Sequence, residues 1–134
     1  MTGRSVCVVP AQLQRTPEGV PFAPEFQDIY HSASGGLAQA RHVFLAGNSL
    51  PDRWRGRDSF TILETGFGLG LNFLAAWDAL RGDPRGPARL HFVSVERHPF
   101  LAADLADALA PFGELRPLAT GLLATWPPPI AGFH

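Results

Sequence analysis

The pattern of apolar and polar positions predicts regular elements over much of the chain. Two apolar runs, 60–64 and 90–96, each end in a glutamate, and residues 71–80 between them have the apolar spacing of a helix. Helical spacing recurs over 101–109 and, more briefly, over 115–126. The order strand, helix, strand, helix is typical of an α/β fold that begins a parallel sheet with right-handed crossovers.

The first part of the chain predicts shorter elements. The turn sequence Thr-Pro-Glu-Gly at 16–19 lies between two extendable segments and predicts a hairpin. Aromatic and polar residues mix over 26–34, which indicates a packed loop more than a pocket cap, and 37–45 has helical spacing. We expect 1–59 to form an extension of hairpin, loop and helix, and 60–134 to form the first βαβα part of the main domain.

Composition and charge narrow the function classes. With 11 basic against 12 acidic residues and a net charge of −1, no global field directs the chain to nucleic acid or membrane. Cys7 is the single cysteine, and the histidines at 42, 91 and 98 lack ligand spacing, so we expect no metal site. No apolar run is long enough for a signal peptide or a membrane span, which favours a cytoplasmic protein.

One basic cluster stands out locally, because Arg53, Arg55 and Arg57 alternate along the chain. Such a cluster could contact a phosphate backbone. A solvated connector explains it better, since Asp52 and Asp58 bracket it. Any RNA contact of this chain must in either case be local.

A glycine-rich loop separates the first predicted strand from its helix, and 64–72 reads Glu-Thr-Gly-Phe-Gly-Leu-Gly-Leu-Asn. Glycines at 66, 68 and 70 permit positive φ and a close approach of the backbone to a ligand. In open parallel sheets, ligands bind beyond the carboxyl ends of the strands, where this loop lies. The loop therefore predicts a ligand site.

Two ligand classes compete for this loop. The dinucleotide fingerprint Gly-x-Gly-x-x-Gly needs a third glycine at the position of Leu71, so an NAD-type oxidoreductase module is the alternative. Glu96 ends the second strand, where a carboxylate can accept two hydrogen bonds from ribose hydroxyls. Glu64 and Glu96 could also be no more than solvated strand ends. The spacing of the loop instead resembles that of class I S-adenosylmethionine methyltransferases.

Four segments together resemble the N-terminal methyltransferase domain of the bacterial MnmC family, which completes 5-methylaminomethyl-2-thiouridine at the tRNA wobble position. They are Phe26-Gln-Asp-Ile-Tyr-His-Ser, Arg41-His-Val-Phe-Leu-Ala-Gly-Asn, Glu64-Thr-Gly-Phe-Gly-Leu-Gly-Leu-Asn-Phe-Leu and Leu90-His-Phe-Val-Ser-Val-Glu. They occur in family order over nearly the whole chain. Leu69 stands where a threonine is expected, and His31 where an aromatic residue is common.

The resemblance implies a Rossmann-like class I methyltransferase fold, of which this chain holds the first half. It implies methyl transfer from S-adenosylmethionine to the aminomethyl group of wobble 5-aminomethyl-2-thiouridine, with tRNA as partner. Residue by residue, it implies cofactor binding by Glu64, Gly66, Gly68, Gly70, Asn72 and Glu96. Asp28 and Tyr30 are the substrate-side candidates by the same resemblance.

The family's catalytic acidic motif and its FAD-dependent oxidoreductase domain both lie beyond the segments matched here. The resemblance therefore implies no catalytic residue in this chain, and FAD only for a further domain. We expect His134 to mark a truncation and the chain to be inactive alone, since two strands leave much of a parallel sheet uncovered. A noncatalytic remnant of the fold is the remaining alternative.

Overall fold

The computed structural model describes residues 8–19, 21–23, 28–29 and 33–134. Three short strands form an antiparallel sheet in the order β1 (Gln14–Arg15), β2 (Pro21–Ala23), β3 (Asp28–Ile29). The backbone N–H of Gly19 donates to the carbonyl of Thr16 at 2.8 Å, and Gly19 has a φ of 81°. The predicted hairpin is therefore confirmed, and glycine occupies the turn position that needs positive φ.

A nearly continuous helical segment follows the small sheet. The α-helix α1 (Ala33–Gln39) continues into the π-helical segment η2 (Ala40–Leu45) and the 3₁₀ turn η3 (Ala46–Asn48). A further 3₁₀ turn, η4 (Asp52–Trp54), leads to the main sheet. The helix predicted over 37–45 is thus confirmed, although its second half winds as a π-helix.

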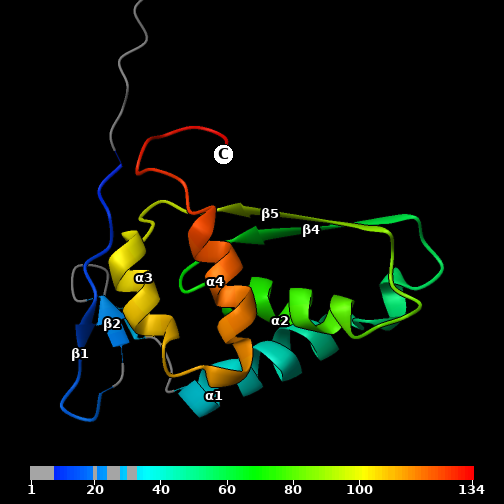
Figure 1. The fold of residues 1–134 in the computed structure, drawn as a ribbon, viewed down its shortest axis with the longest axis horizontal. Helices are drawn as coiled ribbons and strands as arrows, with labels where there is room; N and C mark the ends of the chain where they lie inside the picture. Colours follow the sequence, from blue (N-terminus) through cyan, green and yellow to red (C-terminus); the bar gives the residue numbers. More distant parts are fainter. Residues whose placement is uncertain (1–7, 20, 24–27, 30–32) are drawn as a thin grey trace, which may run out of the picture.

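The main sheet contains two parallel strands, β4 (Ser59–Thr65) and β5 (Arg89–Val95), joined by α2 (Leu71–Arg81). The chain continues through α3 (Ala102–Leu109), the 3₁₀ turn η5 (Gly113–Leu115) and α4 (Arg116–Ala124). In Figure 1, α2 lies beneath the strands, α1 lies beneath α2, and α3 and α4 stand near the carboxyl ends of the strands. The predicted α/β class and the order of its elements are confirmed.

The core lies between α2, the covered face of the sheet, and the last helices. Its largest fully buried side chains are Trp54, Leu74, Leu105 and Leu115. β4 alternates in burial, so Ile62 and Glu64 face the core while Leu63 on the opposite face is 72% exposed. The helices therefore cover one face of the sheet at these positions. No helix in the described part of the chain is long and apolar enough to cross a membrane.

A buried polar contact joins the η4 region to the loop after α2. The Trp54 indole Nε1 donates to Asp83 Oδ2 at 3.0 Å, and Arg55 Nε donates to the same oxygen at 2.8 Å. The Asp83 side chain is only 4% exposed. The hydrogen bond from Trp54 lowers the pKa of Asp83 to about 2; burial opposes this shift, and Arg55 and the Arg85 backbone N–H assist it.

This lowered pKa predicts an acid-dependent loss of stability. The ionised Asp83 stabilises the fold fully above the ordinary aspartate pKa of about 4, and this contribution is lost as the pH falls toward 2. Asp83→Asn should therefore be less stable than wild type near pH 7, with a gap that closes on acidification. Thermal unfolding followed by circular dichroism at stepped pH measures the gap. A gap that stays constant down to the lowest pH contradicts this role of Asp83.

Candidate functional site

The glycine loop connects the carboxyl end of β4 to the first turn of α2. Gly66, Gly68 and Gly70 have φ values of 83°, 55° and 73°, a region that side-chain-bearing residues rarely adopt. The Gly66 N–H donates to the Val95 carbonyl at 2.7 Å, and the Gly70 N–H closes a turn onto the Phe67 carbonyl at 2.8 Å. The predicted need for glycine at these three positions is therefore confirmed.

Two of these glycines face different surroundings. A Cβ added to Gly66 would meet no heavy atom within 4 Å, so the backbone there borders open space. A Cβ added to Gly70 would lie 2.6 Å and 2.8 Å from two ring carbons of Phe67. Gly66 thus leaves room for a ligand to approach the backbone, whereas Gly70 leaves room for an aromatic ring of the loop itself.

Glu64 of β4 is a buried carboxylate held by side chains of two neighbouring elements, α2 and β5. It is 8% exposed, its Oε1 accepts a hydrogen bond from Asn72 Nδ2 at 2.8 Å, and its Oε2 accepts one from Ser94 Oγ at 2.9 Å. Burial raises the pKa of Glu64, the nearby charge of Glu96 acts in the same direction, and the two hydrogen bonds oppose both. Glu64 is therefore no solvated strand end.

Glu96 is fixed directly onto the glycine loop. Its Oε2 accepts a hydrogen bond from the Gly68 N–H at 3.0 Å, and its Oε1 accepts one from the His98 N–H at 2.7 Å. A carboxylate oxygen can accept two hydrogen bonds, so each oxygen retains an acceptor site. Glu96 is thus oriented by backbone donors and can still accept hydrogen bonds from a ligand.

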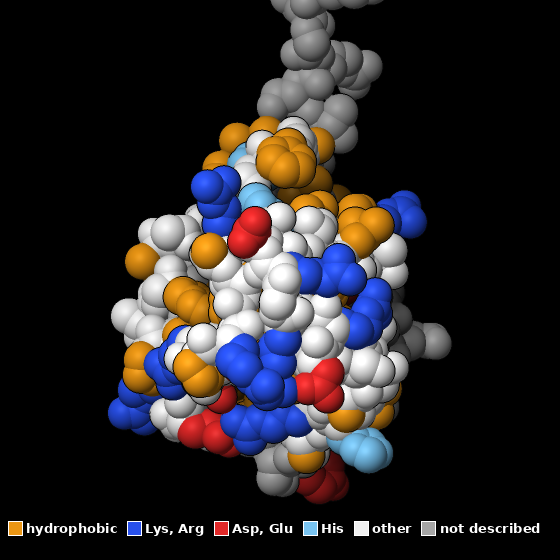
Figure 2. All heavy atoms as spheres, turned by 90° about the vertical axis from the view of Figure 1, so that its right-hand side faces the viewer, with side chains coloured by type: hydrophobic (Ala, Val, Ile, Leu, Met, Phe, Trp, Pro, Cys, Tyr) orange, Lys and Arg blue, Asp and Glu red, His pale blue; other side chains and the backbone are white. Residues whose placement is uncertain are grey.

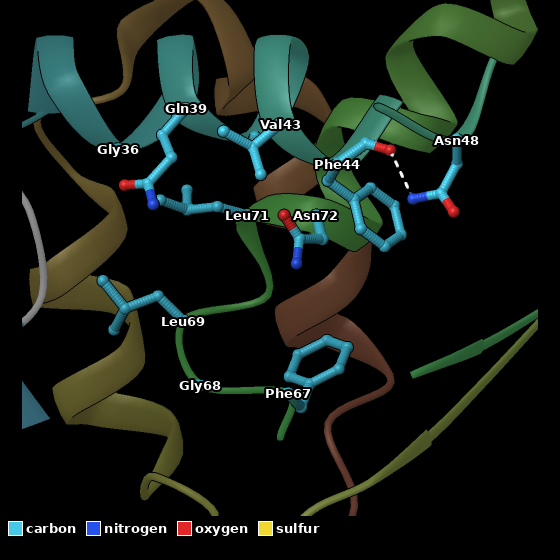
Figure 3. A pocket seen from close by; sticks show the side chains of 11 residues that line it. Gly36, Gln39, Val43, Phe44, Asn48, Phe67, Gly68, Leu69, Leu71 and Asn72 are labelled. Atoms are coloured by element: carbon cyan, nitrogen blue, oxygen red, sulfur yellow. Dashed lines mark hydrogen bonds between the residues drawn. The ribbon is translucent and has the colours of Figure 1, made fainter. Parts of the chain in front are cut away.

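A cavity of about 410 Å³ lies between the α1–η2 helix and the glycine loop (Figure 3). Figure 3 shows the amide groups of Gln39 and Asn72 pointing into the space between helix and loop. Phe44 and Phe67 supply aromatic walls, and Gly68 lies on the floor. This volume is in the usual range for a small-molecule site.

The structure brings most of the predicted cofactor residues together. Glu64 contacts Asn72, Glu96 contacts Gly68, and Gly68 and Asn72 both line the cavity. The two glutamates are not among the lining residues. Of the substrate-side candidates, Asp28 is described only as part of β3, and Tyr30 lies outside the described residues.

Two side chains contribute to the site that no motif in the sequence indicates. Ser94 lies opposite Glu64 in the parallel register, so pairing the two strands at their glutamate-ended tips would have found it. Gln39 belongs to the N-terminal helix, and no spacing in the sequence places that helix over the loop. The helix packs against α2, which places it over the loop.

We expect the buried negative charge of Glu64 to lower the stability of the fold near neutral pH. A variant without this charge measures the effect. Glu64→Gln keeps an oxygen for Asn72 and gains an amide that can donate to Ser94. Because the pKa of Glu64 is raised, the ionised form weakens the fold as the pH rises above the ordinary glutamate pKa of about 4. We expect Glu64→Gln to be at least as stable as wild type near pH 7 and to lose this advantage near pH 4.

Urea unfolding at the two pH values measures this difference. Ser94→Ala is the control, because it removes a hydrogen bond without removing the charge, and it should cost about 1 kcal/mol. A Glu64→Gln variant that is clearly less stable than wild type near neutral pH contradicts the assignment of burial as the dominant influence.

No protein-family model matches the chain. Among curated proteins, it is 58% identical over 127 residues to the tRNA 5-methylaminomethyl-2-thiouridine biosynthesis bifunctional protein MnmC of Thiobacillus denitrificans, which covers 95% of this chain and 20% of the relative. The proteins of the same name from Aromatoleum aromaticum and Azoarcus sp. are 58% and 56% identical, over 93% and 95% of this chain. The chain spans about a fifth of the length of these relatives. The similarity to MnmC proteins is therefore confirmed.

A solved structure shares the fold. The crystal structure of MnmC2 from Aquifex aeolicus matches with a TM-score of 0.54 over 85% of this chain and 37% of that chain. The sequence identity in this match is 20%, so it supports a common arrangement of elements and no common activity.

Proposed function

We propose that this chain is the S-adenosylmethionine-binding part of a Rossmann-like class I methyltransferase domain that modifies tRNA. The acceptor would be the aminomethyl group of wobble 5-aminomethyl-2-thiouridine. The observation that carries the proposal is the positive-φ glycine loop between two parallel strands, with a strand-end carboxylate fixed on each side of it. The names of the MnmC relatives support the choice of tRNA, and a tRNA substrate suits a cytoplasmic enzyme.

The residues present fit this cofactor. Glu96 retains an acceptor site on each oxygen for the two ribose hydroxyls, and the open side of Gly66 admits a ligand against the backbone. Glu64 and Glu96 together offer negative charge to a ligand that carries a sulfonium and an ammonium group. Asn72 holds Glu64 in place and also lines the cavity.

When bound, S-adenosylmethionine would supply a methyl group carried on a positively charged sulfur. The residues of this chain hold and orient the donor, and such positioning accounts for a large share of the rate in displacements of this kind. The glycine loop would bring its backbone against the ligand, and Glu96, held by the Gly68 N–H, would hold the ribose end. Asp28 and Tyr30 are proposed for the acceptor side on the sequence resemblance alone.

The observations favour this function over a dinucleotide-binding one. The position that would need the third glycine of the dinucleotide fingerprint is Leu71, the first residue of α2. Compared with a noncatalytic module, this function also accounts for the buried Glu64 carboxylate, which two side chains hold beside the loop.

A hybrid enzyme tests the proposal. The segment of the Thiobacillus denitrificans relative that matches this chain is replaced by the chain itself, and methyl transfer from labelled S-adenosylmethionine to undermodified tRNA is measured. We expect transfer comparable to that of the unaltered relative. The same hybrid carrying Glu96→Ala is the control and should lose most of this activity. A folded hybrid that transfers no methyl group contradicts the proposed function.

A further inference from the structure

Four exposed arginines gather at the end of the molecule opposite the glycine loop. Arg53 and Arg57 precede β4, while Arg85 and Arg89 lie in the loop before β5 and at the start of that strand. We call these four residues the arginine surface. Figure 2 looks onto this side of the molecule and shows basic side chains gathered there with a few acidic ones beside them. The amino ends of the two parallel strands thus carry a local positive charge.

The two segments that bear these arginines are held together from beneath. Asp83, in the loop before β5, accepts hydrogen bonds from both Trp54 and Arg55 of the segment before β4. Arg55 also pairs with Asp52 at 2.6 Å. Acidic partners therefore neutralise Arg55, whereas among the described residues none of the four arginines of the surface forms an ion pair.

Arg53 and Arg57 are also held in place by their surroundings. Their guanidinium carbons lie 5.8 Å and 5.9 Å from the ring centre of Phe60, within the range of a cation–π contact. Arg57 Nε donates to the Arg53 carbonyl at 3.0 Å, and Arg53 Nη1 donates to the Asn48 carbonyl at 3.4 Å. These contacts restrain both side chains without neutralising their charge, so less entropy is lost when they bind an anion.

We propose that the arginine surface binds the phosphate backbone of RNA. This inference rests on the proposed function, which supplies the RNA. Guanidinium groups match phosphate geometry in a bidentate manner, and contacts to the backbone position a nucleic acid without reading its sequence. The net charge of the chain is −1, so these four arginines, which form no ion pair with any described residue, make a local site rather than part of a general positive field.

The position of the surface sets its role. β4 has seven residues, so the arginine surface lies roughly 20 Å from the glycine loop at about 3.3 Å per residue. These arginines therefore contact RNA away from the reacting nucleotide. They contribute affinity and orientation, and they take no part in the transfer of the methyl group.

Salt-dependent RNA binding tests this inference. The full chain is titrated into a fluorescent, unmodified anticodon stem–loop RNA over a series of salt concentrations. The double variants Arg53→Gln/Arg57→Gln and Arg85→Gln/Arg89→Gln should each weaken binding and lower the slope of log K against log salt by about 2. Arg15→Gln/Arg116→Gln is the control, because it removes the same charge from exposed arginines elsewhere.

The outcomes separate this inference from the proposed function. If both test variants bind RNA like wild type, or if the control variant loses as much RNA affinity as they do, the proposed RNA binding by the arginine surface is wrong. The proposal is also wrong if the arginine surface binds anionic lipid vesicles and does not bind RNA. S-adenosylmethionine affinity is measured on the same variants and should stay at the wild-type value. A loss of that affinity in the variants would show that they disturb the fold, and it would contradict a role confined to RNA.

Discussion

Replacing Glu96 with alanine should weaken binding of S-adenosylmethionine by about 100-fold. Two hydrogen bonds from ribose hydroxyls to a carboxylate, at about 1.5 kcal/mol each, account for a loss of this size. The substitution also removes the acceptor of the Gly68 N–H, which orients the glycine loop. Isothermal titration of the chain with S-adenosylmethionine measures the change.

Two further variants make the Glu96 result specific. Glu96→Gln keeps one acceptor oxygen and should fall between wild type and Glu96→Ala in affinity. Asp107→Ala removes an exposed carboxylate on α3 and should bind like wild type. Wild-type affinity in Glu96→Ala, or an equal loss in Asp107→Ala, contradicts the role of Glu96.

Gly70→Ala should destabilise the chain by about 3 kcal/mol, which combines the cost of a positive φ with a steric clash. The new Cβ would lie 2.6 Å from the Phe67 ring. That ring cannot easily move, because it packs against Phe73 and Trp126 at centroid distances of 5.9 Å and 5.5 Å. Urea denaturation measures the difference in unfolding free energy.

Gly66→Ala is the matched control for this effect. Its φ of 83° imposes a similar backbone cost of about 1–2 kcal/mol, but its Cβ meets no atom within 4 Å. It should therefore be the more stable variant of the two, while its Cβ enters the space assigned to the ligand and weakens binding. Equal destabilisation by Gly66→Ala and Gly70→Ala would show that the clash with Phe67 does not contribute to the loss of stability.

Local sequence signals predicted the elements that lie next to one another in the chain. Helical spacing predicts α2, and the apolar runs predict β4 and β5 to within one residue at each end. The glycines of the loop were identifiable because positive φ is a property of single residues, independent of distant contacts.

Contacts between distant segments could not be predicted in the same way. The hydrogen bond from Trp54 to Asp83 joins residues 29 positions apart. It depends on how η4 packs against the loop after α2. The sequence predicts that the arginines at 53–57 form a solvated connector bracketed by Asp52 and Asp58. In the structure, Arg55 pairs with Asp52 and Asp83, while Asp58 forms no ion pair with a described residue. Charge order along the chain therefore indicates the neighbouring pair of Arg55 with Asp52, but it does not indicate the distant pair of Arg55 with Asp83.

We propose that the glycine loop and its two carboxylates form an S-adenosylmethionine site. Equilibrium dialysis of the folded chain against labelled S-adenosylmethionine, with S-adenosylhomocysteine and NAD⁺ as competitors, tests it most directly. We expect saturable binding that S-adenosylhomocysteine displaces and NAD⁺ does not. Displacement by NAD⁺, or the absence of saturable binding to a chain whose circular dichroism shows it folded, would contradict it.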